Sequence, residues 1–180
     1  MLSSITEKPE LTEYATYYGR YVSLVPGGDI LSTLERQLSD TLALLRNINE
    51  AQADYSYAAD KWSVKELVGH MIDTERIFAY RALCFARNDD TSLPGFEQDD
   101  YIENASFRAY PLAELADEFE HVRRSNLLLF KHLDAEAWKR RGKASDSEVS
   151  VRALAYIIAG HELHHIEVLR SKYLPGILAG

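Results

Sequence analysis

Apolar residues recur at steps of three and four along most of the chain, the spacing that gathers them on one face of an α-helix. The segments with this period are residues 29–48, 63–87, 111–133 and 150–173. Asp29 is a favoured N-cap, Ser63 and Glu66 form a capping box, and Pro111 takes a favoured first helical position. The pattern therefore predicts four helices, and we expect the last to end before Pro175 and Gly176.

The connections between these segments differ in length and character. Residues 1–28 form an arm rich in tyrosine that we expect to wrap the body of the protein. Residues 89–110 carry acids and aromatics, and connections of this length are commonly functional or lid-like. A short helix is expected at 134–140 and a polar loop at 142–147, with no alternation long enough to predict a strand. The predicted fold class is all-α: a four-helix bundle with long connections over residues 29–180, preceded by the N-terminal arm.

Composition and charge exclude several classes of protein. The 180 residues suffice for one large domain, and the net charge of −8 leaves no basic face for a nucleic acid. The longest apolar run, 153–160, is too short to span a bilayer, and the first residues lack the pattern of a signal peptide. We therefore expect a cytoplasmic protein that binds neither nucleic acid nor membrane. The single cysteine, Cys84, cannot form an internal disulfide and is expected in the core.

Two imidazoles, His161 and His165, stand one helical turn apart on the last predicted helix. At about 100° per residue they fall about 40° from each other, on the stripe that also carries Leu154, Ile157 and Ile158. Two buried imidazoles side by side leave ring nitrogens without partners unless something binds them. A divalent metal ion satisfies both rings, so this spacing predicts a metal site.

The remaining histidines differ in where they point. His70 lies beside the apolar stripe of the second helix and faces the core, which makes it the candidate third ligand. His121 and His132 are expected to face water. His164 lies about 60° from His161, which places it beside the site, as a supporting or surface residue rather than a ligand.

Together these residues resemble a known family, the DinB-like (YfiT-like) four-helix-bundle metalloproteins. The resemblance is carried by KWSVKEL at 61–67 with His70, Asp73 and Glu75 after it, and by the closing pair His161 and His165. It covers about residues 29–174 and leaves the arm outside. It implies that the three metal histidines of the family correspond to His70, His161 and His165.

Three neutral imidazoles leave a divalent ion with its full charge and an open position, as in catalytic rather than closed structural sites. Such an ion acidifies a bound water or a bound thiol. The resemblance implies the second route, because characterised members of the family resemble S-transferases or isomerases that use bacillithiol, mycothiol or glutathione. Transfer of a low-molecular-weight thiol to an electrophilic substrate is therefore the leading hypothesis. Zinc and nickel are the favoured metals, with iron or manganese as alternatives.

Other functions stay open at this point. Some members of the family are described only as metal-dependent hydrolases, and a stress-response bundle with a structural metal would need no reaction. His161 and His165 also match the pattern of zinc peptidases with Glu162 as general base, although Val168 and Ser171 break its extended form. A di-iron site would add Glu118–x–x–His121 as a second pair, but His121 is expected to point away from the core.

Two acidic residues are candidates for a supporting role at the metal. Glu162 is considered for orienting a ligand or relaying a proton, with a plain flanking charge as the alternative. Asp73 is considered as partner of the free ring nitrogen of His70, with an outward pair to Arg76 as the alternative.

The surroundings of the site are less specified by the sequence. Part of the long connection is considered as a cover for the metal, and the alternative is a solvated acidic loop. The residues concerned are Phe96, Asp99, Asp100 and Tyr101. Arg81 is about 16 Å along the helix from His70, too far to touch the same substrate atom. Leu163 and Ala159 hint at an exposed apolar contact on the last helix, and a homodimer is expected.

Overall fold

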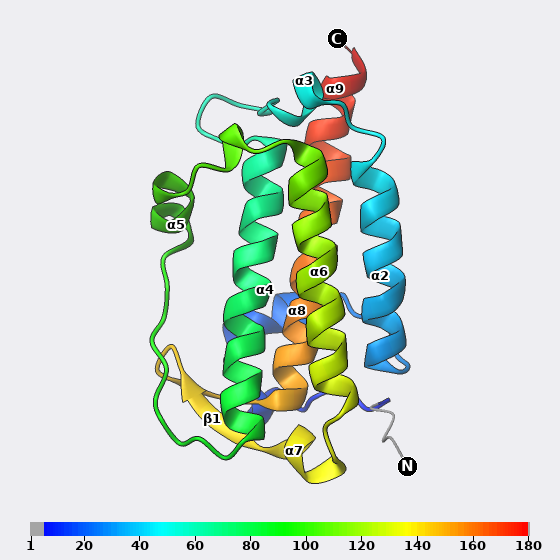
Figure 1. The fold of residues 1–180 in the computed structure, drawn as a ribbon. Coiled ribbons are helices and arrows are strands. Elements are labelled where there is room, and N and C mark those ends of the chain that lie inside the picture. The colour runs from blue at the N-terminus through cyan, green and yellow to red at the C-terminus, as the bar shows by residue number, and fades with distance from the viewer. Residues whose placement is uncertain (1–5, 180) are drawn as a thin grey trace.

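Four long helices lie side by side and form the body of the protein, and the computed structural model describes residues 6–179 (Figure 1). The long helices are α2 (Ile30–Leu45), α4 (Val64–Ala86), α6 (Leu112–Lys131) and α8 (Val151–Val168). Both α2 and α4 pack against α6 and α8, so α2 and α4 occupy opposite corners of the bundle. The predicted four-helix bundle is confirmed. No helix within residues 6–179 is both long and apolar enough to cross a membrane.

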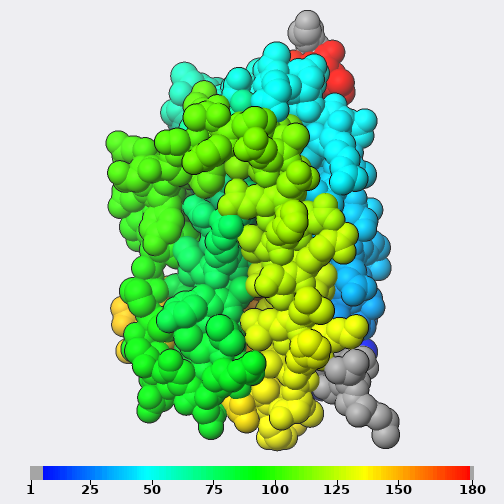
Figure 2. Space-filling view, viewed as in Figure 1, coloured from blue at the N-terminus to red at the C-terminus, as the bar shows by residue number. Residues whose placement is uncertain are grey.

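The four long helices do not alternate in direction along the chain. In Figure 1, α2 and α8 run upwards, whereas α4 and α6 both run downwards. Because α4 and α6 point the same way, the segment between them must return along the length of the bundle. This segment carries α5 (Gln98–Asn104) and the 3-10 helix η3 (Phe107–Ala109). Figure 2 shows it on the surface beside α4, with a hollow between the two.

Side-chain caps begin two of the helices where the sequence predicts them. The Asp29 carboxylate accepts a hydrogen bond from Ser32 N at 2.9 Å, and Ser63 exchanges hydrogen bonds with Glu66. Each cap satisfies backbone N–H groups that have no partner within the helix. The apolar faces that follow fill two buried clusters, one toward each end of the bundle. Cys84 is buried as a free thiol, as predicted.

A short β-hairpin stands where the sequence predicts a polar loop. β1 (Arg141–Ala144) pairs antiparallel with β2 (Ser147–Ser150). The turn residues Ser145 and Asp146 have φ of 51° and 61°, the left-handed region that tight hairpin turns use. Each strand has 4 residues, too few for an alternating pattern to be recognised. The expectation of a loop at 142–147 is therefore wrong.

The last helix also continues beyond its predicted end. α8 passes into a π-helical turn, η4 (Leu169–Tyr173), and then into α9 (Leu174–Ala179). Proline lacks an N–H and clashes with the carbonyl four residues earlier, so it normally interrupts an α-helix. Here the widened turn lies directly before Pro175, which falls in the first turn of α9, where a missing N–H is tolerated.

The arm folds back onto the bundle through three short helices. They are the 3-10 helices η1 (Leu11–Glu13) and η2 (Thr16–Tyr18), and α1 (Gly19–Val22). α1 packs against α8 at Gly160, where an added Cβ would lie 2.1 Å from Tyr21 O. At the start of α8, the Glu13 carboxylate accepts hydrogen bonds from Ser150 Oγ at 2.7 Å and from Arg152. The remaining short helices are α3 (Glu50–Ala53) and α7 (Ala135–Lys139), the latter within the predicted 134–140.

The contact surface expected on the last helix is not exposed. Ala159 is fully buried, and Leu163 is half-buried against the core. α1 packs against α8, and the sequence pattern of α8 does not reveal this cover. The expectation that Ala159 is exposed is therefore wrong, and the homodimer stays a prediction.

Candidate metal centre

Three imidazoles meet between α4 and α8. His70 comes from the N-terminal third of α4, and His161 and His165 come from successive turns of α8. Nε2 of His161 lies 3.0 Å from Nε2 of His70 and 3.0 Å from Nε2 of His165. His70, His161 and His165 are 3%, 6% and 9% exposed as residues, so all three are buried. The structure thus brings together the three residues that the sequence singles out.

This donor set suits a cation better than it suits hydrogen bonding. A neutral imidazole has one N–H and one lone pair, so His161 Nε2 cannot bond well to both neighbouring Nε2 atoms. Within residues 6–179, His165 Nδ1 is buried and has no hydrogen-bond partner. Ligand nitrogens at about 2.0 Å from a tetrahedral zinc lie about 3.3 Å apart, near the separations found here. One divalent ion would accept a lone pair from each of the three Nε2 atoms, and His165 Nδ1, across the ring from Nε2, would still need a partner of its own.

Burial keeps the three rings neutral. Burial, with a smaller contribution from His164, lowers the pKa of His70 to about 4. Burial together with the neighbouring histidines and Arg20 lowers the pKa of His165 to about 2 and that of His161 well below its ordinary value. Neutral imidazole carries the lone pair that a metal ion requires, so the rings are in the ligating form at neutral pH.

Neighbouring side chains hold the rings in place. Thr74 Oγ1 lies 3.4 Å from His70 Nδ1, one turn further along α4. Trp62 packs against His70 with ring centroids 4.8 Å apart, and Tyr21 of the arm meets His161 edge-on at 5.3 Å. Both ligand-bearing helices thus receive support from side chains outside the pair.

Asp73 does not take the supporting role considered for it. Its carboxylate lies 3.8 Å from Arg76 Nη1, and Arg76 also pairs with Glu118 at 2.7 Å. Of the two residues one turn after His70, Thr74 faces the ring and Asp73 faces the surface side of α4. The outward pair with Arg76 is what the structure contains.

Glu162 belongs to a buried ion cluster inside the bundle. Thr41 Oγ1 donates to Glu162 Oε1 at 2.6 Å, and Arg123 Nη1 lies 2.8 Å from Oε2, close enough for an ion pair but not aligned for a hydrogen bond. Arg123 also donates to both oxygens of Glu75, at 2.7 and 2.8 Å. A cavity of about 10 Å³, close to the size of one water, lies between these carboxylates and His161. Any hydrogen-bonded link from Glu162 to His161 would therefore run through a water in this cavity. Because Glu162 is buried and paired with Arg123, the alternative of a plain flanking charge is wrong.

The other histidines lie outside the cluster. His164 is half-buried and packs against Tyr21 and His165, with ring centroids 5.6 and 5.0 Å apart. His121 and His132 are exposed, as predicted. Glu118 pairs with Arg76 at the surface, so it does not join a second metal site with His121.

A cavity of about 380 Å³ opens beside the cluster, and His70 and His161 line it. The arm supplies Tyr17, Tyr18 and Tyr21 to its wall, α4 supplies Phe78, and the connection after α4 supplies residues 95–99. Of the residues considered as a cover, Phe96 and Asp99 therefore line this cavity. Asp100 and Tyr101 are not among its described lining residues.

The tyrosines of the arm are the site residues that sequence reasoning missed. Their density next to a predicted bundle was visible, but no pattern in the sequence pairs the arm with the last helix. The contact depends on Gly160, the point at which α1 approaches α8.

Arg81 fastens the connection beside the cavity. Its Nη2 donates to Pro94 O at 2.7 Å and to Ser145 Oγ at 3.0 Å, in the turn of the hairpin. Leu93 forms backbone hydrogen bonds with the same turn. Arg81 thus positions the wall of the cavity, and it lies apart from the histidines, as the sequence predicts.

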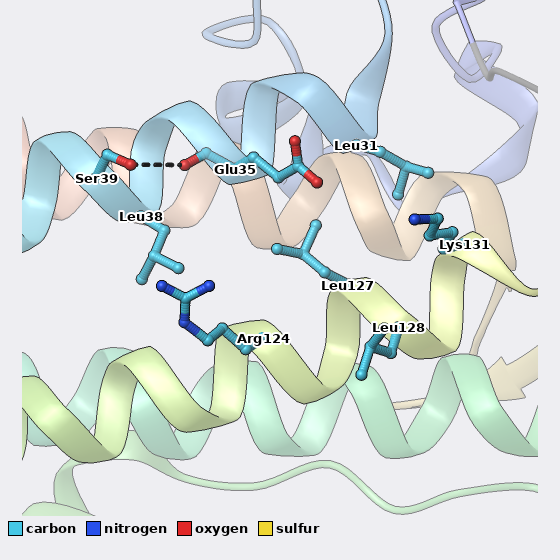
Figure 3. A pocket seen from close by; sticks show the side chains of 8 residues that line it. All are labelled: Leu31, Glu35, Leu38, Ser39, Arg124, Leu127, Leu128 and Lys131. Atoms are coloured by element: carbon cyan, nitrogen blue, oxygen red, sulfur yellow. Dashed lines mark hydrogen bonds between the residues drawn. The ribbon is translucent and has the colours of Figure 1, made fainter.

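A second hollow lies elsewhere on the bundle, between α2 and α6 (Figure 3). It measures about 440 Å³ and has leucines from both helices, with Glu35 and Arg124 at its side. None of the described residues that line it is a histidine. This hollow is therefore separate from the three imidazoles.

Comparisons with known proteins agree with this architecture. A model of the DinB superfamily matches residues 33–169. Among solved structures, YfiT from Bacillus subtilis, described as a probable metal-dependent hydrolase with an unusual four-helix bundle topology, superposes with a TM-score of 0.67. The two sequences are 14% identical, and the match covers 91% of this chain and 92% of that chain. No curated protein sequence matches the chain.

Proposed function

The chain belongs to the DinB superfamily, and from this premise we propose that it is a metal-dependent enzyme that transfers a low-molecular-weight thiol to a small electrophile. The observation that carries the proposal is the position of the cavity. His70 and His161 line it, and both also contribute donor atoms to the histidine cluster. A divalent cation held by three neutral imidazoles retains its charge and an open position, and it lowers the pKa of a thiol or water bound there.

The residues of the chain supply the geometry for this chemistry. Burial holds the three rings neutral, and Thr74 and Trp62 fix His70 from the side away from His161. The arm and the connection after α4 each supply part of the wall of the cavity, so that a small reactant can lie beside the cluster. Arg81 keeps the connection in place.

Hydrolysis is the second candidate, because YfiT is described as a probable metal-dependent hydrolase and a water can replace a thiol at the same position. A purely structural metal fits this site less well. Structural zinc sites use four protein ligands, whereas residues 6–179 bring three together here.

The test is an assay of protein loaded with Zn²⁺ or Ni²⁺. A panel of thiols would be offered with a chlorinated bimane, and activated esters would be offered separately. We expect thiol consumption that is lost in His165→Ala and retained in His121→Ala, which removes an exposed histidine on α6. Ester hydrolysis without thiol transfer would select the second candidate. Bound metal with neither activity would contradict the proposal that the protein is an enzyme.

A further inference from the structure

The aromatic residues of the cavity stand at right angles to one another. Tyr17 and Tyr18 meet at 83° with centroids 5.3 Å apart, and Tyr18 meets Phe78 at 84° and 5.8 Å. Tyr21 continues the series, at 79° to Tyr17 and 74° to the ligand-bearing His161. These rings contact one another edge-to-face along the wall of the cavity, and the π-faces of aromatic rings attract cations.

The charged residues that line the cavity also favour a positively charged ligand. Glu97 and Asp99 line it at the start of α5, and none of its described lining residues is lysine or arginine. Both carboxylates are exposed at its mouth, whereas His70 and His161 are buried on its inner side with their Nε2 atoms facing each other. The cavity therefore has an acidic outer end and a metal-ligating inner end.

The aromatic rings of the arm already hold one cation of the chain itself. The guanidinium carbon of Arg20 lies 3.9 Å from the ring centroid of Tyr17 and 4.8 Å from that of Tyr21. Arg20 does not line the cavity, so it occupies these rings from outside.

We propose that this cavity binds a small molecule with a positively charged nitrogen, an amine or quaternary ammonium, placed among the tyrosines and the two carboxylates. The opposite end of the molecule would lie beside His70 and His161. This inference rests on the proposed function for its reaction and narrows the substrate class. Thiols with a net negative charge, such as glutathione with two carboxylates and one ammonium group, meet repulsion from Glu97 and Asp99, whereas thiols or electrophiles with a net positive charge are attracted.

The test compares choline with 3,3-dimethylbutan-1-ol, which has the same shape without the charge. Binding would be measured by isothermal titration calorimetry, on metal-free and metal-loaded protein. We expect choline to bind about tenfold more tightly than the alcohol, the size of a cation–π contribution reinforced by carboxylates. Because the metal-free protein is included, failure of the thiol assay would leave this result standing.

The chain offers matched variants. Asp99→Asn and Glu97→Gln should each weaken choline binding several-fold, whereas Asp100→Asn, a neighbouring acid outside the cavity, should leave it unchanged. Arg20→Gln should strengthen it, because the substitution removes a positive charge that lies against Tyr17 and Tyr21 outside the cavity and repels a cation within it. Equal affinity for choline and the alcohol, no binding of either, or an equal effect of Asp99→Asn and Asp100→Asn would each overturn the proposal.

Discussion

His70 has two polar neighbours one turn away on α4, and only one of them touches its ring. Thr74 Oγ1 lies 3.4 Å from Nδ1, whereas Asp73 is engaged by Arg76. When Nε2 serves as a ligand, Nδ1 carries the proton and can donate it to a hydrogen bond, which fixes the plane of the ring. Thr74 is therefore the side chain through which the orientation of this ligand can be tested.

We expect Thr74→Val to weaken metal binding by at most about tenfold, because 3.4 Å is long for a hydrogen bond and such supports act through orientation. Asp73→Asn is the matched control and should bind metal as the unchanged protein does. Titration with Ni²⁺ can be followed by quenching of Trp62, whose ring lies 4.8 Å from that of His70. A larger loss in Asp73→Asn than in Thr74→Val would contradict this assignment.

The three histidines could be predicted from the sequence because each lies on the apolar face of its own helix, and a helix has a fixed period. Glu162 could not be interpreted in the same way. The helical period gives the angle of Glu162 around α8. The role of Glu162 depends instead on Thr41 and Arg123, which approach it from α2 and α6. Periodicity gives the direction in which a side chain points and not the groups that meet it.

At the level of elements, the arm depends on one close approach. The backbone of α1 crosses α8 at Gly160, so a methyl group there would meet Tyr21 O at 2.1 Å. We expect Gly160→Ala to lower the free energy of unfolding by about 1–3 kcal/mol, the usual cost of overpacking, although alanine favours a helix. Chemical denaturation measures this loss, and limited proteolysis should then cut within the arm.

Gly27→Ala is the control for this substitution, since nothing lies within 4 Å of the position that its Cβ would take. Its stability should stay within about 0.5 kcal/mol of the unchanged protein. If Gly160→Ala changed the free energy of unfolding no more than Gly27→Ala does, and left the arm as resistant to proteolysis, α1 would not pack closely against α8 at Gly160.

The second attachment of the arm, at Glu13, is sensitive to pH. Burial alone would raise the pKa of this carboxyl, but hydrogen bonds from Arg152 and Ser150 outweigh it and leave the pKa below its ordinary value of 4.5. A lowered pKa in the folded state stabilises the fold above the ordinary value, and this stabilisation disappears as the pH falls through the folded pKa.

We therefore expect Glu13→Gln to cost about 1–3 kcal/mol at pH 7, where a charge-assisted hydrogen bond is lost, and progressively less below pH 4.5. Urea unfolding of both proteins across this range gives the difference directly. Glu35→Gln, at an exposed carboxyl on α2, should show no such trend. A difference that grows on acidification would contradict the assigned direction of the pKa shift.

The elements that the sequence predicts best are those with several turns. The four long helices and the caps at Asp29 and Ser63 follow from period and capping residues, which act locally, whereas Pro111 precedes the first residue of α6 instead of occupying it. The hairpin at 141–150 and the π-helical turn before Pro175 could not be predicted in this way. The hairpin has too few residues for a period, and the turn is a local adjustment that lets α8 continue into α9.

At the scale of the whole molecule, the site lies where separate parts of the chain converge. The two ligand-bearing helices pack against each other, and the histidines lie between the two apolar clusters of the bundle. The arm closes one side of the cavity, and the connection that reverses the direction of the chain between α4 and α6 closes another. The family signature in the sequence predicts the three metal ligands. That the arm and the connection meet beside them follows from the order and direction of the helices, which the helix pattern does not determine.

This arrangement predicts what happens when the metal is removed. The clusters at either end of the bundle bury apolar residues from all four long helices without any contribution from the three imidazoles, so the fold has its own source of stability. A metal that binds only the folded state adds RT ln(1 + [M]/Kd), about 2.7 kcal/mol at a hundredfold excess over Kd. Chelation should therefore lower the melting temperature and abolish turnover while leaving the helical circular dichroism signal in place. If the helical signal were lost on chelation, the ion would be holding α4 and α8 together, and the site would be structural rather than catalytic.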